Sequence, residues 1–146
     1  MPMTFADLSL GQRADFEVEV SPHDLDRFAE LSGDTSALHM DREFARQRGF
    51  PDRVVHGAYL AALVSRLVGV HLPGQNCLLH GLSLQFKSAV AVGVRVRVEG
   101  VVDQLSAAVE VAVLKVSITD VATGSTVATA KVQLGFTRDQ PGGIQA

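Results

Sequence analysis

The sequence predicts a single α+β domain in which an antiparallel sheet wraps around one long apolar helix. Three observations predict this class. The chain has 146 residues, a length typical of one domain, and 47% of them are hydrophobic, which is enough for a core. The first half carries a long apolar segment of helical character. The second half alternates apolar and polar residues with the period of β-strands.

One strand and two short helices are expected ahead of the apolar segment. Residues 13–20 (RADFEVEV) alternate and predict a strand. Ser21 is a suitable N-cap and Pro22 suits a first helical position, so a helix is expected from there to Ser32 and Gly33. A second short helix is expected from Asp41 to Gly49.

The apolar segment HGAYLAALVSRLVGVHLPG, residues 56–74, is expected to be a helix covered on most of its sides, because it is apolar almost all round. The cover is expected from strands at residues 82–90, 94–102, 108–120 and 127–136, which short turns join into an antiparallel meander. A change of phase near Val113 and Leu114 indicates a bulge or a change of strand partner.

A single antiparallel sheet curled around one apolar helix is the hot-dog architecture. We expect this domain to span residues 1–139, followed by a flexible C-terminal tail at residues 140–146, where Pro and Gly cluster. Such a sheet leaves its edges open. Edge-to-edge pairing of two copies would close them, so a homodimer is expected.

Composition excludes several classes of function. The formal net charge of −3 argues against nucleic acid as the main partner. The single cysteine, Cys77, excludes an internal disulfide and a Cys-rich metal motif. Residues 58–70 are interrupted by polar residues and are shorter than the roughly 20 needed to span a bilayer. No secretory signal is recognised at the N-terminus. A soluble, cytoplasmic protein without a membrane partner is therefore expected.

The stretch SGDTSALH, residues 32–39, places an acid, Asp34, five positions before a base, His39. The two residues follow the expected end of a helix, and a loop can turn both toward one point. This arrangement is compatible with a catalytic pair. It is also compatible with an Asx-turn at Asp34 and a partly buried His39 bonded to backbone.

A second candidate element is VVHG at the start of the apolar helix. Gly57 lacks a Cβ, so its main chain can approach a ligand, and an N–H at a helix N-terminus stabilises a developing oxyanion. The alternative is that Gly57 only permits tight packing. Ser65 lies two turns further on, where its hydroxyl can also bond back to the preceding turn.

Three ordered stretches resemble the (R)-specific enoyl-CoA hydratases, the MaoC-like or hydratase-2 group, over nearly the whole chain. The first is FAELSGDTSALHMD, and the second is Val55, His56 and Gly57. The third, residues 72–93, resembles the strand that follows the family's central helix. The matching signature residues of the first stretch are Phe28, Gly33, Asp34, Leu38, His39 and Asp41.

The resemblance implies a lyase that hydrates trans-2-enoyl thioesters of CoA or acyl carrier protein, or catalyses the reverse dehydration, with no metal or other cofactor. Asp34 and His39 would activate water, and the Gly57 N–H would polarise the thioester carbonyl. Substrate-binding roles are implied for Ser36, His56, Ser65 and Val68, with Ser65 supporting the acid and Val68 lining an acyl pocket. Ser36 and Ala37 replace the Asn-Pro that is common in the family.

The residue pattern favours other functions less than this one. A metal site would use Asp34, His39, Asp41 and His56, but their spacing matches no recognised ligand motif. A serine hydrolase is disfavoured because no G-x-S-x-G motif is present. A hot-dog thioesterase usually carries its carboxylate on the long helix, and residues 58–70 contain neither Asp nor Glu. A non-catalytic acyl-thioester-binding protein is the remaining alternative.

Overall fold

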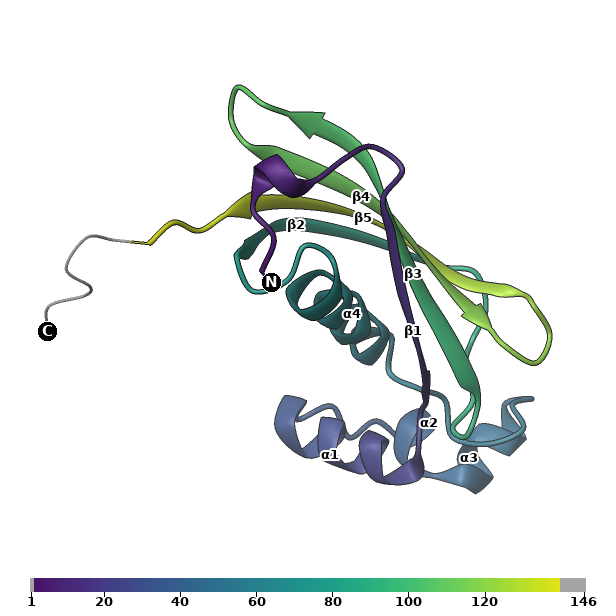
Figure 1. Ribbon diagram of the computed structural model, residues 1–146. Coiled ribbons are helices and arrows are strands. Elements are labelled where there is room, and N and C mark those ends of the chain that lie inside the picture. Colours follow the sequence, from purple (N-terminus) through teal and green to yellow (C-terminus); the bar gives the residue numbers. More distant parts are fainter. Residues whose placement is uncertain (1, 140–146) are drawn as a thin grey trace, which may run out of the picture.

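One curved antiparallel sheet of five strands forms the frame of the computed structural model, which describes residues 2–139 (Figure 1). The strand order is β1-β3-β4-β5-β2, and every neighbouring pair is antiparallel. The strands are β1 (Arg13–Glu19), β2 (Cys77–Phe86), β3 (Arg95–Ser106), β4 (Val111–Asp120) and β5 (Thr126–Phe136). The predicted tail, residues 140–146, lies outside the described residues.

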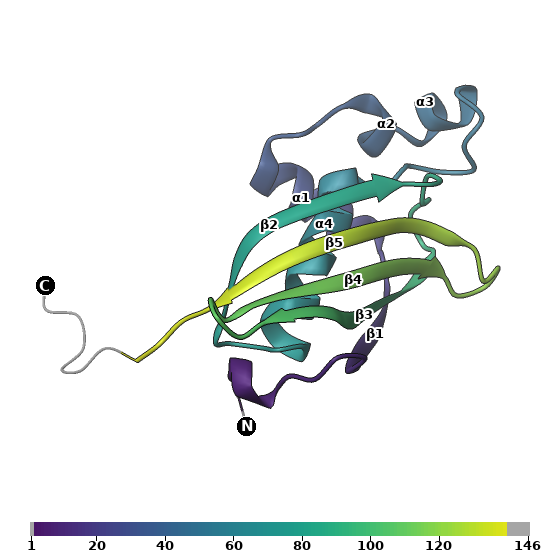
Figure 2. The same ribbon diagram turned by 90° about the horizontal axis from the view of Figure 1, so that it is seen from above.

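Helix α4 lies against the inner face of the curved sheet, and helices α1, α2 and α3 gather at one end of the molecule (Figures 1 and 2). The helices are η1 (Phe5–Asp7), α1 (Pro22–Ser32), α2 (Ala37–Met40), α3 (Arg42–Gln47), α4 (Gly57–Arg66) and η2 (Leu67–His71). The element η2 is a π-helix that continues α4 directly. The predicted α+β hot-dog class is confirmed.

The core lies between α4–η2 and the inner face of the sheet. Leu60, Leu63 and Val64 of α4 are buried, as are alternate residues of β3 and β4 such as Val98 and Leu114. Gly100 in the middle of β3 makes the close approach possible, since a Cβ there would lie 2.6 Å from Leu67 Cδ2. The Leu67 side chain of η2 can therefore pack directly on the main chain of β3 at Gly100.

The predicted boundaries of α1 are confirmed, whereas the helix predicted from Asp41 to Gly49 spans only Arg42–Gln47, and α4 with η2 ends at His71 instead of residue 74. The Ser21 hydroxyl accepts a hydrogen bond from the Asp24 N–H at 3.1 Å, and Asp24 Oδ2 accepts from the Ser21 N–H at 3.0 Å, which completes a capping box. Helix α1 ends at Gly33, whose φ of 78° lies in the left-handed region. Asp41 caps α3 by accepting from the Phe44 N–H at 3.1 Å.

The strand predictions need corrections. Strand β3 runs to Ser106 instead of residue 102, and β4 begins at Val111 instead of residue 108. Strand β2 spans Cys77–Phe86 instead of residues 82–90, and it pairs with β5 instead of β3, so only β3, β4 and β5 form a meander. A bulge at His80, between the pairs Leu79–Leu134 and Gly81–Gln133, breaks the alternation that would have revealed the start of β2. The chain leaves the sheet after Phe86, and the Val90 carbonyl accepts from the Val55 N–H at 2.7 Å.

The irregularity predicted near Val113 and Leu114 is present, but the extra residue belongs to the neighbouring strand. Val102 pairs with Leu114 and Gln104 pairs with Val113, which leaves Asp103 of β3 as the bulged residue. The buried residues of β4 keep one phase throughout, at Ala112, Leu114, Val116 and Ile118.

The helix is less completely covered than predicted. One side is exposed and carries mostly small residues, namely Ala58, Ala62, Ser65 and Gly69, together with Val70. Strand β2 is an outer strand of the sheet, and Leu78, Leu79 and Phe86 on it are 41–54% exposed. Among residues 2–139 no helix has the length and apolarity needed to cross a membrane.

Candidate functional site

Asp34 is held by an Asx-turn that uses one of its two carboxylate oxygens. The Ser36 hydroxyl donates to Asp34 Oδ1 at 2.9 Å, and the Ser36 N–H donates to the same oxygen at 3.2 Å. The Asp34 N–H donates to Ser32 Oγ at 3.1 Å. The turn proposed as the alternative function of Asp34 therefore exists, yet it leaves Oδ2 free for a second role.

The same two donors lower the pKa of Asp34. The hydrogen bonds from the Ser36 hydroxyl and from the Ser36 N–H hold the pKa of the Asp34 carboxyl below its ordinary value. Burial opposes this lowering, whereas the electrostatic influence of His39, and then that of His56, adds to it. Asp34 is consequently a carboxylate at neutral pH, with Oδ2 as an open acceptor.

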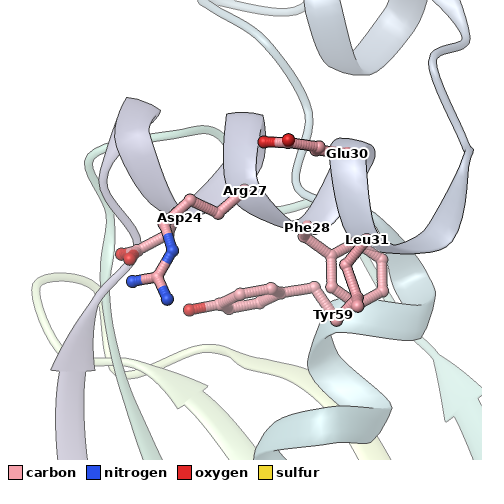
Figure 3. A pocket seen from close by; sticks show the side chains of 6 residues that line it. All are labelled: Asp24, Arg27, Phe28, Glu30, Leu31 and Tyr59. Atoms are coloured by element: carbon pink, nitrogen blue, oxygen red, sulfur yellow. The ribbon is translucent and has the colours of Figure 1, made fainter.

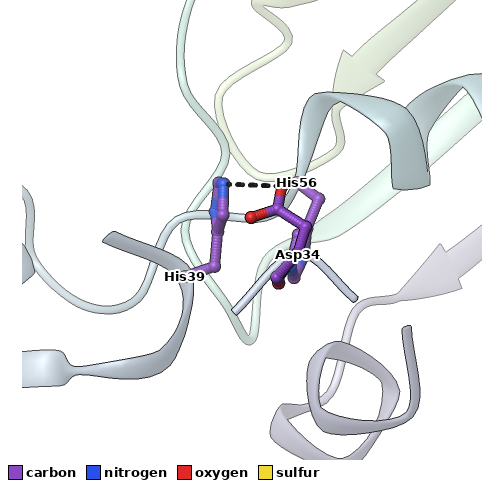
Figure 4. Close-up of side chains that lie close together, drawn as sticks. All are labelled: Asp34, His39 and His56. Atoms are coloured by element: carbon purple, nitrogen blue, oxygen red, sulfur yellow. Dashed lines mark hydrogen bonds and ion pairs between the residues drawn. The ribbon is translucent and has the colours of Figure 1, made fainter. Parts of the chain in front are cut away.

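His39 lies on α2, a single helical turn where the sequence predicts a loop. Its Nδ1 is 2.7 Å from the Val54 carbonyl oxygen, which can only accept, so Nδ1 carries the proton and Nε2 of the neutral ring is an acceptor. His39 Nε2 is 3.8 Å from Asp34 Oδ2 (Figure 4). This separation exceeds a direct hydrogen bond and fits a bridging donor such as water.

His56 lies behind this pair and is 1% exposed. Its Nε2 donates to the main-chain carbonyl of Asp34 at 3.0 Å. Its ring stacks on His39 with a centroid separation of 4.0 Å and an interplanar angle of 24°. The substrate-binding role predicted for His56 would require a side chain that reaches an open space, whereas this one is buried.

Gly57 is the first residue of α4 and borders a cavity of about 450 Å³ that begins at His39. The His56 side chain makes no capping hydrogen bond, and no acceptor within residues 2–139 takes the Gly57 N–H. A Cβ at position 57 would lie 2.7 Å from Phe86 Cζ, so the phenyl ring occupies the space that glycine leaves. The cavity is lined mainly by apolar groups: Val54, Val55, Leu60, Phe86, Ala89 and Val90, with Lys87 and Ser88.

The predicted site residues are brought together only in part. Asp34, Ser36, His39, His56 and Gly57 form one cluster around the start of α4. Ser65 is exposed further along α4, and Val68 is buried in η2. Neither lines the cavity beside His39. Their substrate-binding roles stay predictions.

Two elements of the site escaped the sequence analysis. The Val54 carbonyl, which determines the tautomer of His39, is a main-chain atom with no side-chain signature. Phe86 reaches the cavity because β2 ends at this residue. The strand predicted at residues 82–90 places Phe86 inside a strand, so it does not indicate that the side chain is 54% exposed. The signal that could have indicated Phe86 is an aromatic residue at the end of a strand, in a chain whose central helix begins with a glycine.

A second hollow of about 530 Å³ lies between α1 and α4 (Figure 3). It is lined by Asp24, Arg27, Phe28, Glu30, Leu31 and Tyr59. Burial, followed by the charge of Asp24, raises the pKa of the Tyr59 hydroxyl. Of the two carboxylates that line this hollow, Asp24 is engaged in the capping box of α1, and Glu30 points away from Tyr59 (Figure 3).

Asp34, His39 and His56 are close enough to be considered as metal ligands, since one potential ligand atom of each lies within 4.8 Å of the others. The two imidazole planes are nearly parallel, at 24°, so their in-plane lone pairs do not converge on one ion as tetrahedral zinc requires. Asp41, the fourth residue of the predicted metal alternative, caps α3 instead. The geometry fits a metal poorly.

A curved sheet over one central helix, with a carboxylate and a histidine beside an apolar cavity, defines a hot-dog domain with an acid–histidine site. The chain belongs to the family described as MaoC like domain, whose model matches residues 6–131. The family resemblance is thereby confirmed.

Individual relatives agree with this family. The chain is 37% identical over 113 residues to the (R)-specific enoyl-CoA hydratase of Aeromonas caviae, covering 77% of this chain and 78% of that protein. It is 36% identical over 97 residues to the 3-hydroxybutyryl-CoA dehydratase of Methylorubrum extorquens, covering 65% of this chain and 62% of the relative's length.

Solved structures are similar as well. The (R)-hydratase from A. caviae involved in PHA biosynthesis superposes with a TM-score of 0.85 at 34% identity, covering 89% of this chain and 98% of that one. The R-hydratase PhaJ1 from Pseudomonas aeruginosa, in its unliganded form, gives a TM-score of 0.86 at 26% identity, covering 93% and 86%.

Replacing Ser36 by alanine is expected to raise the pKa of Asp34 toward its ordinary value, because the hydroxyl is the strongest influence that lowers it. A lowered pKa keeps the carboxylate ionised to lower pH, so the variant will take up its proton at higher pH than the wild type. A ¹³C NMR titration of the Asp34 carboxyl measures this, with Asp34→Asn to assign the signal.

Thr35→Ala is the matched control, since the Thr35 side chain makes no hydrogen bond with any residue from 2 to 139. Its Asp34 titration should overlie that of the wild type. Identical midpoints for Ser36→Ala and wild type would show that the Asx-turn does not set the charge of Asp34.

Proposed function

We propose that this protein hydrates trans-2-enoyl thioesters to (R)-3-hydroxyacyl thioesters, or catalyses the reverse dehydration. The observation that carries the proposal is the pair of facing acceptors, Asp34 Oδ2 and His39 Nε2, 3.8 Å apart beside an apolar cavity. The named activities of the A. caviae and M. extorquens relatives support the same reaction.

A water molecule between these atoms would donate one O–H to each of them. With the His39 ring neutral, both atoms are acceptors without a proton, because Asp34 is ionised and the Val54 carbonyl holds the His39 proton on Nδ1. In this pose the water's lone pair is directed at C3 of the substrate. Asp34 removes one proton as C–O bond formation proceeds, and His39 Nε2 keeps the water oriented.

The electron pair of the C2–C3 double bond moves toward the thioester oxygen during this addition. The Gly57 N–H, at the positive end of α4, is the donor that stabilises the resulting enolate oxygen. The enolate then recovers a proton at C2 from the acid–histidine pair, on the same face. The net change is a hydroxyl on C3 and a hydrogen on C2, which accounts for every atom of the water.

The proposed substrate is a thioester of CoA or of acyl carrier protein, and its acyl chain enters the apolar cavity lined by Leu60 and Phe86. Ser36 acts by holding Asp34. The acyl-pocket role predicted for Val68 requires space beyond this cavity, and the role predicted for Ser65, support of the acid, requires contact with Asp34. The predicted cytoplasmic location stays a prediction, which cell fractionation would test.

Crotonyl-CoA should lose the absorbance of its conjugated thioester when it is incubated with the purified protein. Asp34→Asn and His39→Ala should each lower kcat by about 10²- to 10⁴-fold, the range typical of a lost general acid–base group. Thr35→Ala should keep wild-type activity, since its side chain is not bonded to the pair.

The same assay separates the competing functions. Release of free CoA, detected with a thiol reagent, would favour a thioesterase. If the wild type hydrates no enoyl-CoA and no enoyl-acyl carrier protein across a range of chain lengths, the proposed reaction is wrong, and a non-catalytic binding protein becomes the better hypothesis.

We propose further that the reaction requires no metal. The near-parallel rings of His39 and His56 and the use of His39 Nδ1 by Val54 support this. Dialysis against EDTA should leave the hydration rate unchanged. A loss of activity that Zn²⁺ restores would show that the trio of Asp34, His39 and His56 is a metal site.

The proposed assembly is a homodimer in which β2 pairs with β2 of a second copy. The supporting features are the outer position of β2 in the sheet and its exposed apolar residues Leu78, Leu79 and Phe86. Because Phe86 also borders the cavity, the second copy would lie beside each site.

Light scattering should therefore give a mass twice that of the 15.5 kDa chain. Leu78→Lys should shift the equilibrium toward the single chain, because it places a charge at the paired edge. Val109→Lys, at a residue that is 67% exposed in the β3–β4 turn, is the matched control and should leave the mass unchanged. A wild-type mass of one chain would exclude the dimer.

A further inference from the structure

His56 is the one polar residue that the structure buries in the core of residues 2–139, at 1% exposure. Its Nε2 has a partner, but Nδ1 has none within the described chain. A buried polar atom without a partner is unfavourable, so an apolar side chain would serve better if filling space were the only requirement. The reason for a histidine at this position is therefore expected in the contacts that its side chain makes.

The first contact is with the loop that carries Asp34. The other hydrogen bonds of residues 33–36 within the described chain are local, reaching no further than Ala29 on one side and His39 on the other. The bond from His56 Nε2 to the Asp34 carbonyl spans 22 positions. It is the hydrogen bond that ties this loop to the start of α4.

The second contact is with the ring of His39. The Val54 carbonyl fixes the direction of the His39 Nδ1–H, but a single hydrogen bond leaves the ring free to rotate about that axis. The stacked His56 ring, 4.0 Å away, removes this rotation. Phe28 supports the His56 ring with a centroid separation of 4.9 Å, so the stack is itself held in place.

We propose that His56 is a positioning residue that sets the separation of Asp34 and His39, through its hydrogen bond to the Asp34 carbonyl and its stacking on the His39 ring. It does not line the cavity beside His39, and it acts on the pair through these two contacts. This inference rests on the proposed hydration reaction. It replaces the direct contact with substrate that the sequence resemblance implied for His56.

Substitution of a residue with this role is expected to lower kcat and to leave substrate binding unchanged. His56→Phe keeps a flat ring against His39 but loses the N–H, and His56→Gln keeps a donor of similar reach but loses the ring. His56→Phe should lower kcat for crotonyl-CoA at least tenfold with KM within twofold of wild type. His56→Gln should recover part of that loss, because it restores the bond to Asp34.

Val64→Ala is the matched control for a purely structural effect. Val64 is 1% exposed on α4 and does not line the cavity beside His39. It should lower the melting temperature and leave kcat unchanged. Wild-type kcat in both His56 variants, an effect on KM alone, or an equal loss of kcat in Val64→Ala would overturn the proposal.

Hydrogen exchange of the Ser36 amide provides a reading that does not depend on activity. His56→Phe should accelerate this exchange, since the loop loses its connection to α4, whereas His56→Gln and Val64→Ala should not. An unchanged rate in His56→Phe would overturn the anchoring role. An inactive wild type with accelerated exchange in His56→Phe would instead count against the proposed hydration and leave the anchoring intact.

Discussion

The hydrogen bond between His39 Nδ1 and the Val54 carbonyl is the interaction on which the chemistry of the site depends. A carbonyl accepts and never donates, so this bond leaves His39 Nε2 without a proton as long as the ring is neutral. An Asp–His pair usually shares a proton, with the acid orienting the base. Here the proton is held on the far side of the ring, and the facing atoms are two acceptors that a small donor can bridge.

The fold supplies this bond through the segment that leads into α4. Val54 accepts from His39, Val55 donates to the Val90 carbonyl, and His56 donates to the carbonyl of Asp34. Three consecutive residues thus connect α2, the chain after β2 and the loop after α1. The position of the site follows from that of α4, which packs on Gly100 through Leu67 of η2.

Much of this fold could be predicted because its local signals agree with one another. Ser21, Asp24 and Gly33 delimit α1 through side-chain hydrogen bonding and backbone freedom, which are properties of the residues themselves. The pairing of β2 with β5 could not be predicted, because the bulge at His80 erases the alternation and strand order is not a local property. Asp34, His39 and Gly57 were identified from their spacing and family resemblance. The Val54 carbonyl and the stack of His56 on His39 were not, since a main-chain acceptor and a ring-to-ring contact depend on tertiary position.

The two carboxylate oxygens of Asp34 make different contacts, and this restricts which acidic residue can occupy the position. Oδ1 closes the turn with Ser36, while Oδ2 faces His39, so the side chain must satisfy two geometries at once. A glutamate has the same charge, but its additional methylene would move both oxygens away from the Ser36 N–H or past His39. The choice of aspartate is therefore dictated by side-chain length as much as by acidity, and a chemist seeking a stronger base here would have to rebuild the loop along with the acid.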